Sequence, residues 1–168
     1  IGTIRLKENS RLIKPKNLDV AIIGAGISGL CSALLLERLG CNVIIFEKDK
    51  YIKSEGAGIQ ITSNGLFVLK KLDLDRLVVE AGFKPNKLCL LDENDFKSIG
   101  CLEIRDRLKR RYGRSFLTLQ RSLLIKILFE KVKEKKIRVN FGSRALPLVK
   151  KDSEDIYISY KGKKIEKD

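Results

Sequence analysis

Residues 18–29 read Leu-Asp-Val-Ala-Ile-Ile-Gly-Ala-Gly-Ile-Ser-Gly, an apolar run that leads directly into a glycine-rich turn. The run is short and rich in β-branched residues, which is typical of a buried parallel strand. Apolar residues then recur at helical spacing through residues 27–39, and Gly40 predicts the end of that helix. Residues 42–46 predict a second buried strand. Strand, helix and strand fit into about 30 residues, the size of one βαβ unit.

The glycines of the turn have the spacing G-x-G-x-x-G, which between a strand and a helix predicts a dinucleotide-binding site. Gly24 would permit the tight turn, and Gly26, which has no Cβ, would let a pyrophosphate approach the backbone. Gly29 would let the helix pack closely against the strand. The helix that begins near Ile27 would point its free N–H groups at the phosphates, and Ser28 could add a hydroxyl hydrogen bond.

Glu47 follows the second strand, about 20 residues after the glycines, where the fingerprint requires an acidic residue. A carboxylate there accepts hydrogen bonds from ribose hydroxyls. The same charge would repel a 2′-phosphate, which argues against NADP at this site. The alternative is a glycine-rich turn with an unrelated Glu, which the agreement of spacing, strand and helix disfavours.

The rest of the chain has a more β-rich pattern. We expect short strands at residues 59–61, 87–91 and 137–141, helices at residues 64–71, 74–81 and 122–132, and an antiparallel pair within residues 149–160. Ser63 or Asn64 could cap the first of these helices. We expect residues 1–17 to form a basic N-terminal arm and residues 18–168 to form an incomplete dinucleotide-binding domain, in which the strands of a substrate domain are only partly present.

The composition excludes several classes of protein. The 168 residues, 43% of them hydrophobic, suit a single domain with one core. The chain has no histidine, so a Ser-His-Asp or Cys-His hydrolase and a His-coordinated zinc site are excluded, and we predict no metal site. No C-x-x-C pair occurs, and we expect buried, reduced thiols, which suit a reducing compartment. The four cysteines are Cys31, Cys41, Cys89 and Cys101.

The formal net charge is +14, and basic residues concentrate at residues 105–114. One interpretation is binding to nucleic acid or to an anionic membrane surface. The other is a solvated basic face, which we favour because no nucleic-acid motif accompanies the charge. We therefore expect no nucleic-acid partner and leave peripheral membrane contact open. No apolar run approaches the roughly 20 residues that a transmembrane helix needs.

The glycine turn together with Glu47 and Lys48 resembles the FAD-binding start of flavoproteins with two dinucleotide-binding folds. The segment Gly-Ala-Gly-Ile-Gln-Ile at residues 56–61, followed by Asn64-Gly65 and Leu69, resembles class A flavin-dependent monooxygenases. That family includes the 4-hydroxybenzoate hydroxylases and zeaxanthin epoxidase. Residues 119–124 are similar to the start of a helix whose arginine contacts FAD in that family. The resemblance covers roughly residues 18–141.

The resemblance implies a Rossmann-like α/β fold with a parallel sheet, bound FAD, NAD(P)H as reductant, and O2 with an aromatic or olefinic small molecule as substrates. It implies that Glu47 holds the adenosine ribose, that Lys48 lies near the adenine and that Gly58 lies close to the flavin. Arg121 would reach the cofactor from its helix. The oxygen chemistry needs no acid–base pair, so we name no catalytic residue. The implied cofactor-binding set is Gly24, Gly26, Ile27, Ser28, Gly29, Glu47, Lys48, Gly58 and Arg121.

The chain departs from the family pattern at three places. Ser63 stands where a proline is usual, Asp73 stands where a glycine is common, and the downstream Gly-Ala-Asp-Gly motif does not occur. The abrupt ends lead us to expect a piece of a longer protein, inactive by itself. The alternatives are another FAD-dependent oxidoreductase, such as an amine oxidase or a dehydrogenase, and a non-catalytic nucleotide-binding or interaction module. We expect a cytoplasmic location, with an organelle as the alternative.

Overall fold

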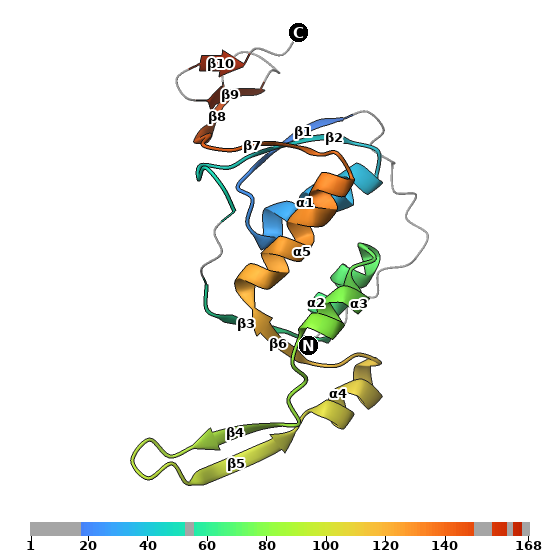
Figure 1. Ribbon diagram of the computed structural model, residues 1–168, viewed down its shortest axis with the longest axis vertical. Coiled ribbons are helices and arrows are strands. Elements are labelled where there is room, and N and C mark those ends of the chain that lie inside the picture. Colours follow the sequence, from blue (N-terminus) through green and yellow to red (C-terminus); the bar gives the residue numbers. More distant parts are fainter. Residues whose placement is uncertain (1–17, 53–55, 150–155, 161–162, 166–168) are drawn as a thin grey trace.

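The computed structural model describes residues 18–52, 56–149, 156–160 and 163–165 (Figure 1). The expected basic arm, residues 1–17, lies outside the described residues. An α/β unit occupies the middle of an elongated molecule, a two-stranded hairpin projects from one end, and a small antiparallel sheet lies at the other end.

The central sheet is parallel, with the order β1-β2-β7. Strands β1 (Asp19–Ile23) and β2 (Asn42–Phe46) pair along their whole length, and β7 (Arg138–Asn140) pairs with the second half of β2. The predicted βαβ unit is confirmed, as is the third strand. Helix α1 (Ile27–Arg38) connects β1 to β2, and Gly40 follows it with φ +89°, the left-handed conformation that ends many helices.

Helices α1 and α5 (Arg121–Glu134) lie side by side and run in the same direction (Figure 1). This follows from the topology, because α1 leaves β1 and α5 leads into β7 of the same parallel sheet. Both helices have buried residues, and each buried Leu, Ile or Val side chain contributes about 1.5–3 kcal/mol of burial free energy. The buried residues of the two helices are Leu30, Ala33, Leu34, Leu124, Ile125, Leu128 and Val132.

A second pair of strands joins two segments that are distant in sequence. β3 (Gly58–Ile61) pairs antiparallel with β6 (Leu117–Gln120), which the sequence pattern did not predict. Helices α2 (Ser63–Lys71) and α3 (Asp75–Ala81) pack against each other beside this pair. The expected capping role of Ser63 or Asn64 is wrong, because Thr62 is the N-cap residue and makes no side-chain capping bond.

The structure explains two of the departures from the family pattern. Ser63 is the first helical residue of α2, a position where proline is favoured, and its hydroxyl donates to the carbonyl oxygen of Arg114 at 3.1 Å. Asp73 has φ +59°, a conformation that glycine adopts freely and that Asp tolerates better than most residues. Its carboxylate pairs with Arg38 at 3.1 Å.

The hairpin arm consists of β4 (Lys87–Leu91), β5 (Ser98–Glu103) and α4 (Arg105–Tyr112). Every residue of both strands is exposed. The expectation of buried, reduced thiols is wrong for Cys89 and Cys101, which form a disulfide across the two strands. It failed because a disulfide between facing positions depends on strand register, which cysteine spacing alone does not reveal.

The C-terminal part forms an antiparallel sheet with the order β10-β9-β8. Its strands are β8 (Ala145–Val149), β9 (Ile156–Tyr160) and β10 (Lys163–Ile165). The hairpin or antiparallel pair expected within residues 149–160 is present with different bounds, because β9 pairs with β8, and four of the five residues of β8 precede Val149. Residues 150–155, between these strands, lie outside the described residues.

Candidate cofactor-binding site

The glycine-rich turn connects β1 to α1 in the conformation that its spacing predicts. Gly24 has φ +100°, and its N–H donates to the carbonyl oxygen of Phe46 at 2.7 Å, which ties the turn to the neighbouring strand. A Cβ at Gly29 would lie 2.0 Å from the carbonyl oxygen of Gly24, so only glycine allows this close approach of helix and strand. A Cβ at Gly26 would meet no atom within 4 Å, so the backbone is open there.

Gly26 is the N-cap residue of α1 and provides no side chain to cap the helix. The first turn of α1 therefore leaves backbone N–H groups for an outside acceptor, next to the open space at Gly26. Ile27 is half-buried and Ser28 is exposed. A helix N-terminus with free N–H groups and no acidic side chain in its first turn favours an anion.

Glu47 follows β2 directly, and the backbone holds its side chain in place. Oε2 accepts a hydrogen bond from the N–H of Ala25, in the middle of the glycine turn, at 2.7 Å. Oε1 accepts one from the N–H of Asp49 at 2.9 Å. Each carboxylate oxygen keeps further lone pairs, so the anchored carboxylate can accept hydrogen bonds from a vicinal diol as well.

The end of β7 and the segment after it hold the backbone of Glu47 from the other side, a role that we did not expect from the sequence. The N–H of Glu47 donates to Asn140 at 2.9 Å, and the N–H of Ser143 donates to the carbonyl oxygen of Glu47 at 2.7 Å. Ser143 is only 1% exposed, and its hydroxyl donates to the carbonyl oxygen of Phe141. One signal was available, since Gly142 separates a buried strand from a small polar residue.

A second glycine segment lies against the start of α5. The N–H of Arg121, the first residue of α5, donates to the carbonyl oxygen of Ala57 at 3.2 Å. A Cβ at Gly56 would lie 3.4 Å from the Cβ of Arg121, so these two segments of the chain are in contact. Gly58 begins β3 and faces Gln120 in the antiparallel register. The exposed Arg121 side chain adds a positive charge to the N-terminus of α5.

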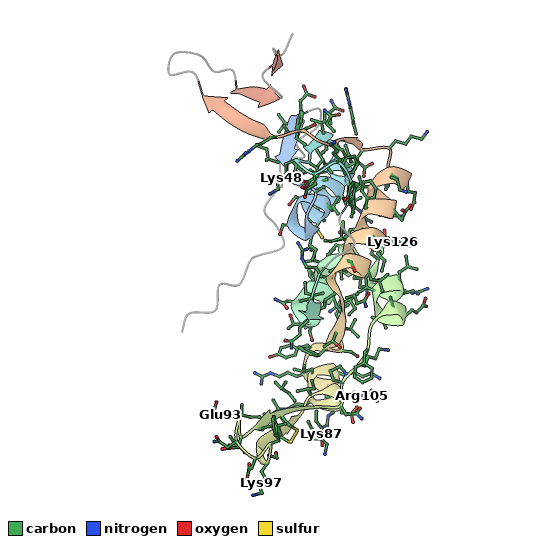
Figure 2. The ribbon with its side chains drawn as sticks, turned by 60° about the vertical axis from the view of Figure 1, so that its left-hand side comes forward. Lys48, Lys87, Glu93, Lys97, Arg105 and Lys126 are labelled. Atoms are coloured by element: carbon green, nitrogen blue, oxygen red, sulfur yellow. A yellow bond between two sulfur atoms is a disulfide. The ribbon has the colours of Figure 1, made fainter. Side chains whose placement is uncertain are left out.

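The N-terminal ends of α1 and α5 point toward the same end of the molecule, because the two helices are parallel neighbours (Figure 1). The turn with Glu47 and the segment with Gly58 and Arg121 therefore flank the carboxyl end of the parallel sheet, where open α/β sheets bind ligands. Lys48 is exposed and follows Glu47 (Figure 2). This arrangement combines two positive helix ends with one fixed carboxylate, which suits an anionic ligand that carries hydroxyl groups.

Among the described residues, no group of three or more Cys, Asp or Glu side chains could hold a metal ion. Within the same part of the chain, no helix is long and apolar enough to cross a membrane.

The chain is similar to hydroxylases, monooxygenases and an epoxidase, and each similarity covers only part of the relative's length. The chain is 31% identical over 104 residues to 3-hydroxybenzoate 6-hydroxylase 1 of Aquipseudomonas alcaligenes, covering 62% of this chain and 26% of that protein. It is 41% identical over 66 residues to the chloroplastic zeaxanthin epoxidase of Prunus armeniaca, covering 37% and 10%. The chain thus spans about a quarter of the hydroxylase.

Solved structures share the fold at lower identity. A variant of 2-methyl-3-hydroxypyridine-5-carboxylic acid oxygenase superposes with a TM-score of 0.74 at 23% identity, over 90% of this chain and 38% of that one. Klebsiella pneumoniae HpxO, in complex with FAD and uric acid, gives a TM-score of 0.71 at 22% identity, over 88% and 36%.

The family model that matches the chain is FAD dependent oxidoreductase, and it covers residues 19–137. These residues include the βαβ unit, the glycine turn, Glu47 and the whole of α5. The relatives confirm the resemblance to flavin-dependent aromatic hydroxylases and to zeaxanthin epoxidase. With the glycine turn, the fixed carboxylate and the parallel sheet, the match establishes that the chain belongs to the FAD dependent oxidoreductase family.

Proposed function

We propose that the chain is the FAD-binding part of an NAD(P)H-dependent flavoprotein monooxygenase that hydroxylates or epoxidises an aromatic or olefinic small molecule with O2. The observation that carries the proposal is the position of Glu47. Its carboxylate is held by the glycine turn on one side and by Asp49 on the other, where it can accept the hydroxyls of an adenosine ribose.

We assign the glycine turn to the pyrophosphate of FAD. Gly24 and Gly29 form the turn, and the backbone of Gly26, Ile27 and Ser28 would hold the pyrophosphate in the open space that a Cβ at Gly26 would fill.

Three residues complete the proposed set. Lys48 would lie near the adenine, Gly58 would approach the flavin, and Arg121 would pair with the cofactor from the start of α5. Once bound, FAD supplies the redox chemistry, while these residues bind it, orient it and balance its charge.

The names of the relatives support the substrate class. They include hydroxylases of 3-hydroxybenzoate and 6-hydroxynicotinate, so an aromatic acid is our first choice of substrate for the whole protein. Zeaxanthin epoxidase supports an olefinic substrate as the second. We place the whole protein in the cytoplasm, as expected for bacterial aromatic hydroxylases, and the chloroplastic epoxidase keeps an organelle as the alternative.

Titration with FAD tests this proposal. In Gly26→Val the new side chain occupies the space that the pyrophosphate needs, so we expect FAD affinity to fall more than tenfold. Gly100→Val is the matched control, because a Cβ at Gly100 also meets no atom within 4 Å but lies on the hairpin arm. Circular dichroism melts of both variants check that the fold is kept. Equal FAD affinity in the two folded variants would refute the proposed site.

The alternatives are separated by two further observations. A non-catalytic module would bind FAD weakly or not at all, so the purified protein would lack the yellow colour of oxidised flavin. Another FAD-dependent oxidoreductase would be yellow, but the whole protein would not couple NAD(P)H oxidation to oxygenation of an aromatic acid. Coupled product formation by the whole protein would support the monooxygenase.

A further inference from the structure

The hairpin arm carries its disulfide on the surface. Cys89 and Cys101 are directly opposite each other in the β4–β5 register, and both residues are exposed. The other two cysteines carry thiols, with Cys41 buried and Cys31 half-buried in α1. Burial raises the pKa of the Cys31 thiol, which lowers its thiolate fraction and its reactivity. Of the four cysteines, the two bridged ones are therefore the most accessible to a dissolved thiol.

One residue of the bridge borders a hollow of about 610 Å³ between β5 and α4. Cys101 lines this hollow together with Arg107 and Arg110, whereas Cys89 does not line it. Figure 2 shows this part of the molecule, with Lys87 on the hairpin and Arg105 at the start of α4.

The hollow is lined by two acidic and two basic residues, and its positive surroundings come from Lys87 and from the other basic residues of α4. Its lining includes Glu103 and Asp106, but Glu103 is paired with Lys87 at 3.0 Å. Asp106 is the only acidic residue of α4, which has five basic ones. Such an excess raises the local concentration of small anions. The basic residues of α4 are Arg105, Arg107, Lys109, Arg110 and Arg111.

A hydroxyl group also contacts the sulfur of Cys101. Ser98 Oγ lies 3.4 Å from Cys101 Sγ. A disulfide sulfur has no proton, so the hydroxyl is the donor in the oxidised state. The same donor, together with the charges of Arg107 and Arg110 that line the same hollow, would stabilise a thiolate on Cys101 after the bridge opens, and the thiolate is the reactive form.

We infer that the Cys89–Cys101 bridge is a reversible thiol–disulfide exchange site for small anionic thiols, with Cys101 as the exchanging residue and Cys89 as the resolving residue. The inference does not depend on FAD binding. It rests on the exposure of the bridge, on the hollow beside Cys101 and on the charge of α4.

The thiolate of a small thiol attacks Cys101 Sγ, the S–S bond breaks, and Cys89 leaves as a thiolate that takes up a proton. A second small thiol attacks the mixed disulfide and releases Cys101, so that two small thiols give two electrons to the bridge and become one small disulfide. That small disulfide is the oxidant for the reverse reaction. Reduction removes the cross-link of a two-stranded hairpin, a structure that is marginal by itself.

The first test compares an anionic with a neutral thiol on the oxidised chain. Glutathione and 2-mercaptoethanol are used as reductants, and opening of the bridge is followed by thiol titration. We expect Arg107→Gln/Arg110→Gln to lower the ratio of the glutathione rate to the mercaptoethanol rate about fivefold, because the attraction for the anion is lost. The control Arg76→Gln/Arg138→Gln, which removes two exposed arginines outside the hollow, should leave that ratio unchanged.

The second test separates the two cysteines. In Cys89→Ser and Cys101→Ser, each remaining thiol reacts with glutathione disulfide, and the adducts are measured by mass spectrometry. We expect Cys101 to react at least about threefold faster than Cys89. Four results would each overturn the inference. The oxidised, denatured chain could show four titratable thiols, or glutathione could fail to open the bridge. The arginine variant could leave the rate ratio unchanged, or the two cysteines could react equally fast.

Discussion

The βαβ unit and the hairpin arm are of similar length but bury very different fractions of their side chains. In the βαβ unit, Leu30, Ala33 and Ile45 are fully buried. In the hairpin arm both strands are exposed on both faces, and α4 has no buried residue. The unit is stabilised by packing between a sheet and two helices, whereas the arm is held by a disulfide and surface ion pairs.

The difference shows where a change in sequence should matter for stability. Burial of apolar area is the main stabilising contribution in folding, and exposed ion pairs such as Lys87–Glu103 contribute about 0–1 kcal/mol. Substitutions in the βαβ unit should therefore change global stability strongly. Matched substitutions in the arm should change it little.

The largest effect is expected for Gly29→Ala. The new Cβ would be 2.0 Å from the backbone oxygen of Gly24, so helix and strand must separate. We expect the free energy of unfolding to fall by more than about 4 kcal/mol, above the usual range for one substitution. Gly100→Ala on the arm should change it by less than about 0.5 kcal/mol. Urea titrations measure both, and similar losses would break the contrast between the two regions.

A smaller loss is expected for Leu30→Ala, which leaves a cavity between α1 and the core. Leu30 is 0% exposed, so the cost should be about 3 kcal/mol. The matched change Leu90→Ala removes a side chain that is 65% exposed and should cost less than about 0.5 kcal/mol. Thermal melts followed by circular dichroism can compare the two. An equal cost would mean that the apolar face of the hairpin is covered in solution.

The smallest effect concerns Asp73, where the family prefers glycine. Asp73→Gly relieves the left-handed conformation but loses an exposed pair with Arg38, so we expect a change within about 0.5 kcal/mol. Asp73→Ala keeps the unfavourable φ and loses the pair, and should cost about 1 kcal/mol. Differential scanning calorimetry of both variants tests this order. A more stable alanine than glycine variant would contradict it.

The parts of the fold that could be predicted are those in which burial leaves a period in the sequence. Strand β2 was predicted with its observed bounds, and α1 ends one residue earlier than expected. The third strand and helices α2 and α3 followed from the same kind of pattern, whereas the final antiparallel pair begins four residues earlier than expected. Strand β6 was missed although Leu117 and Leu119 alternate with polar residues over its four positions.

The parts that could not be predicted depend on contacts between distant segments. Helix α4 has one aliphatic residue, Leu108, so its sequence shows charge but no apolar stripe. The disulfide depends on the register of β4 and β5. In the site, too, only local features could be predicted, since the glycines and Glu47 were identified from their spacing. The support of Glu47 by Asn140 and Ser143, nearly one hundred residues further along the chain, could not be predicted.

The proposed roles of the site residues remain predictions, and Glu47→Gln tests the central one. The amide keeps one oxygen but replaces the other with an N–H donor, so the variant loses the charge and one of the two bonds from Ala25 and Asp49. Thermal melts establish whether the glycine turn survives this loss. A distorted turn would weaken every nucleotide, whereas loss of charge alone would weaken FAD and relieve the repulsion of a 2′-phosphate.

Parallel calorimetric titrations of the wild-type chain and Glu47→Gln with FAD and NADP are the most direct measurement. We expect wild type to bind FAD more tightly than NADP. We expect the variant to lose about tenfold in FAD affinity, since charge-assisted hydrogen bonds to the ribose are worth about 1.5–3 kcal/mol. We also expect NADP binding by the variant to be unchanged or tighter. Tighter binding of NADP than of FAD by wild type would contradict the assignment of this site to the adenosine ribose of FAD.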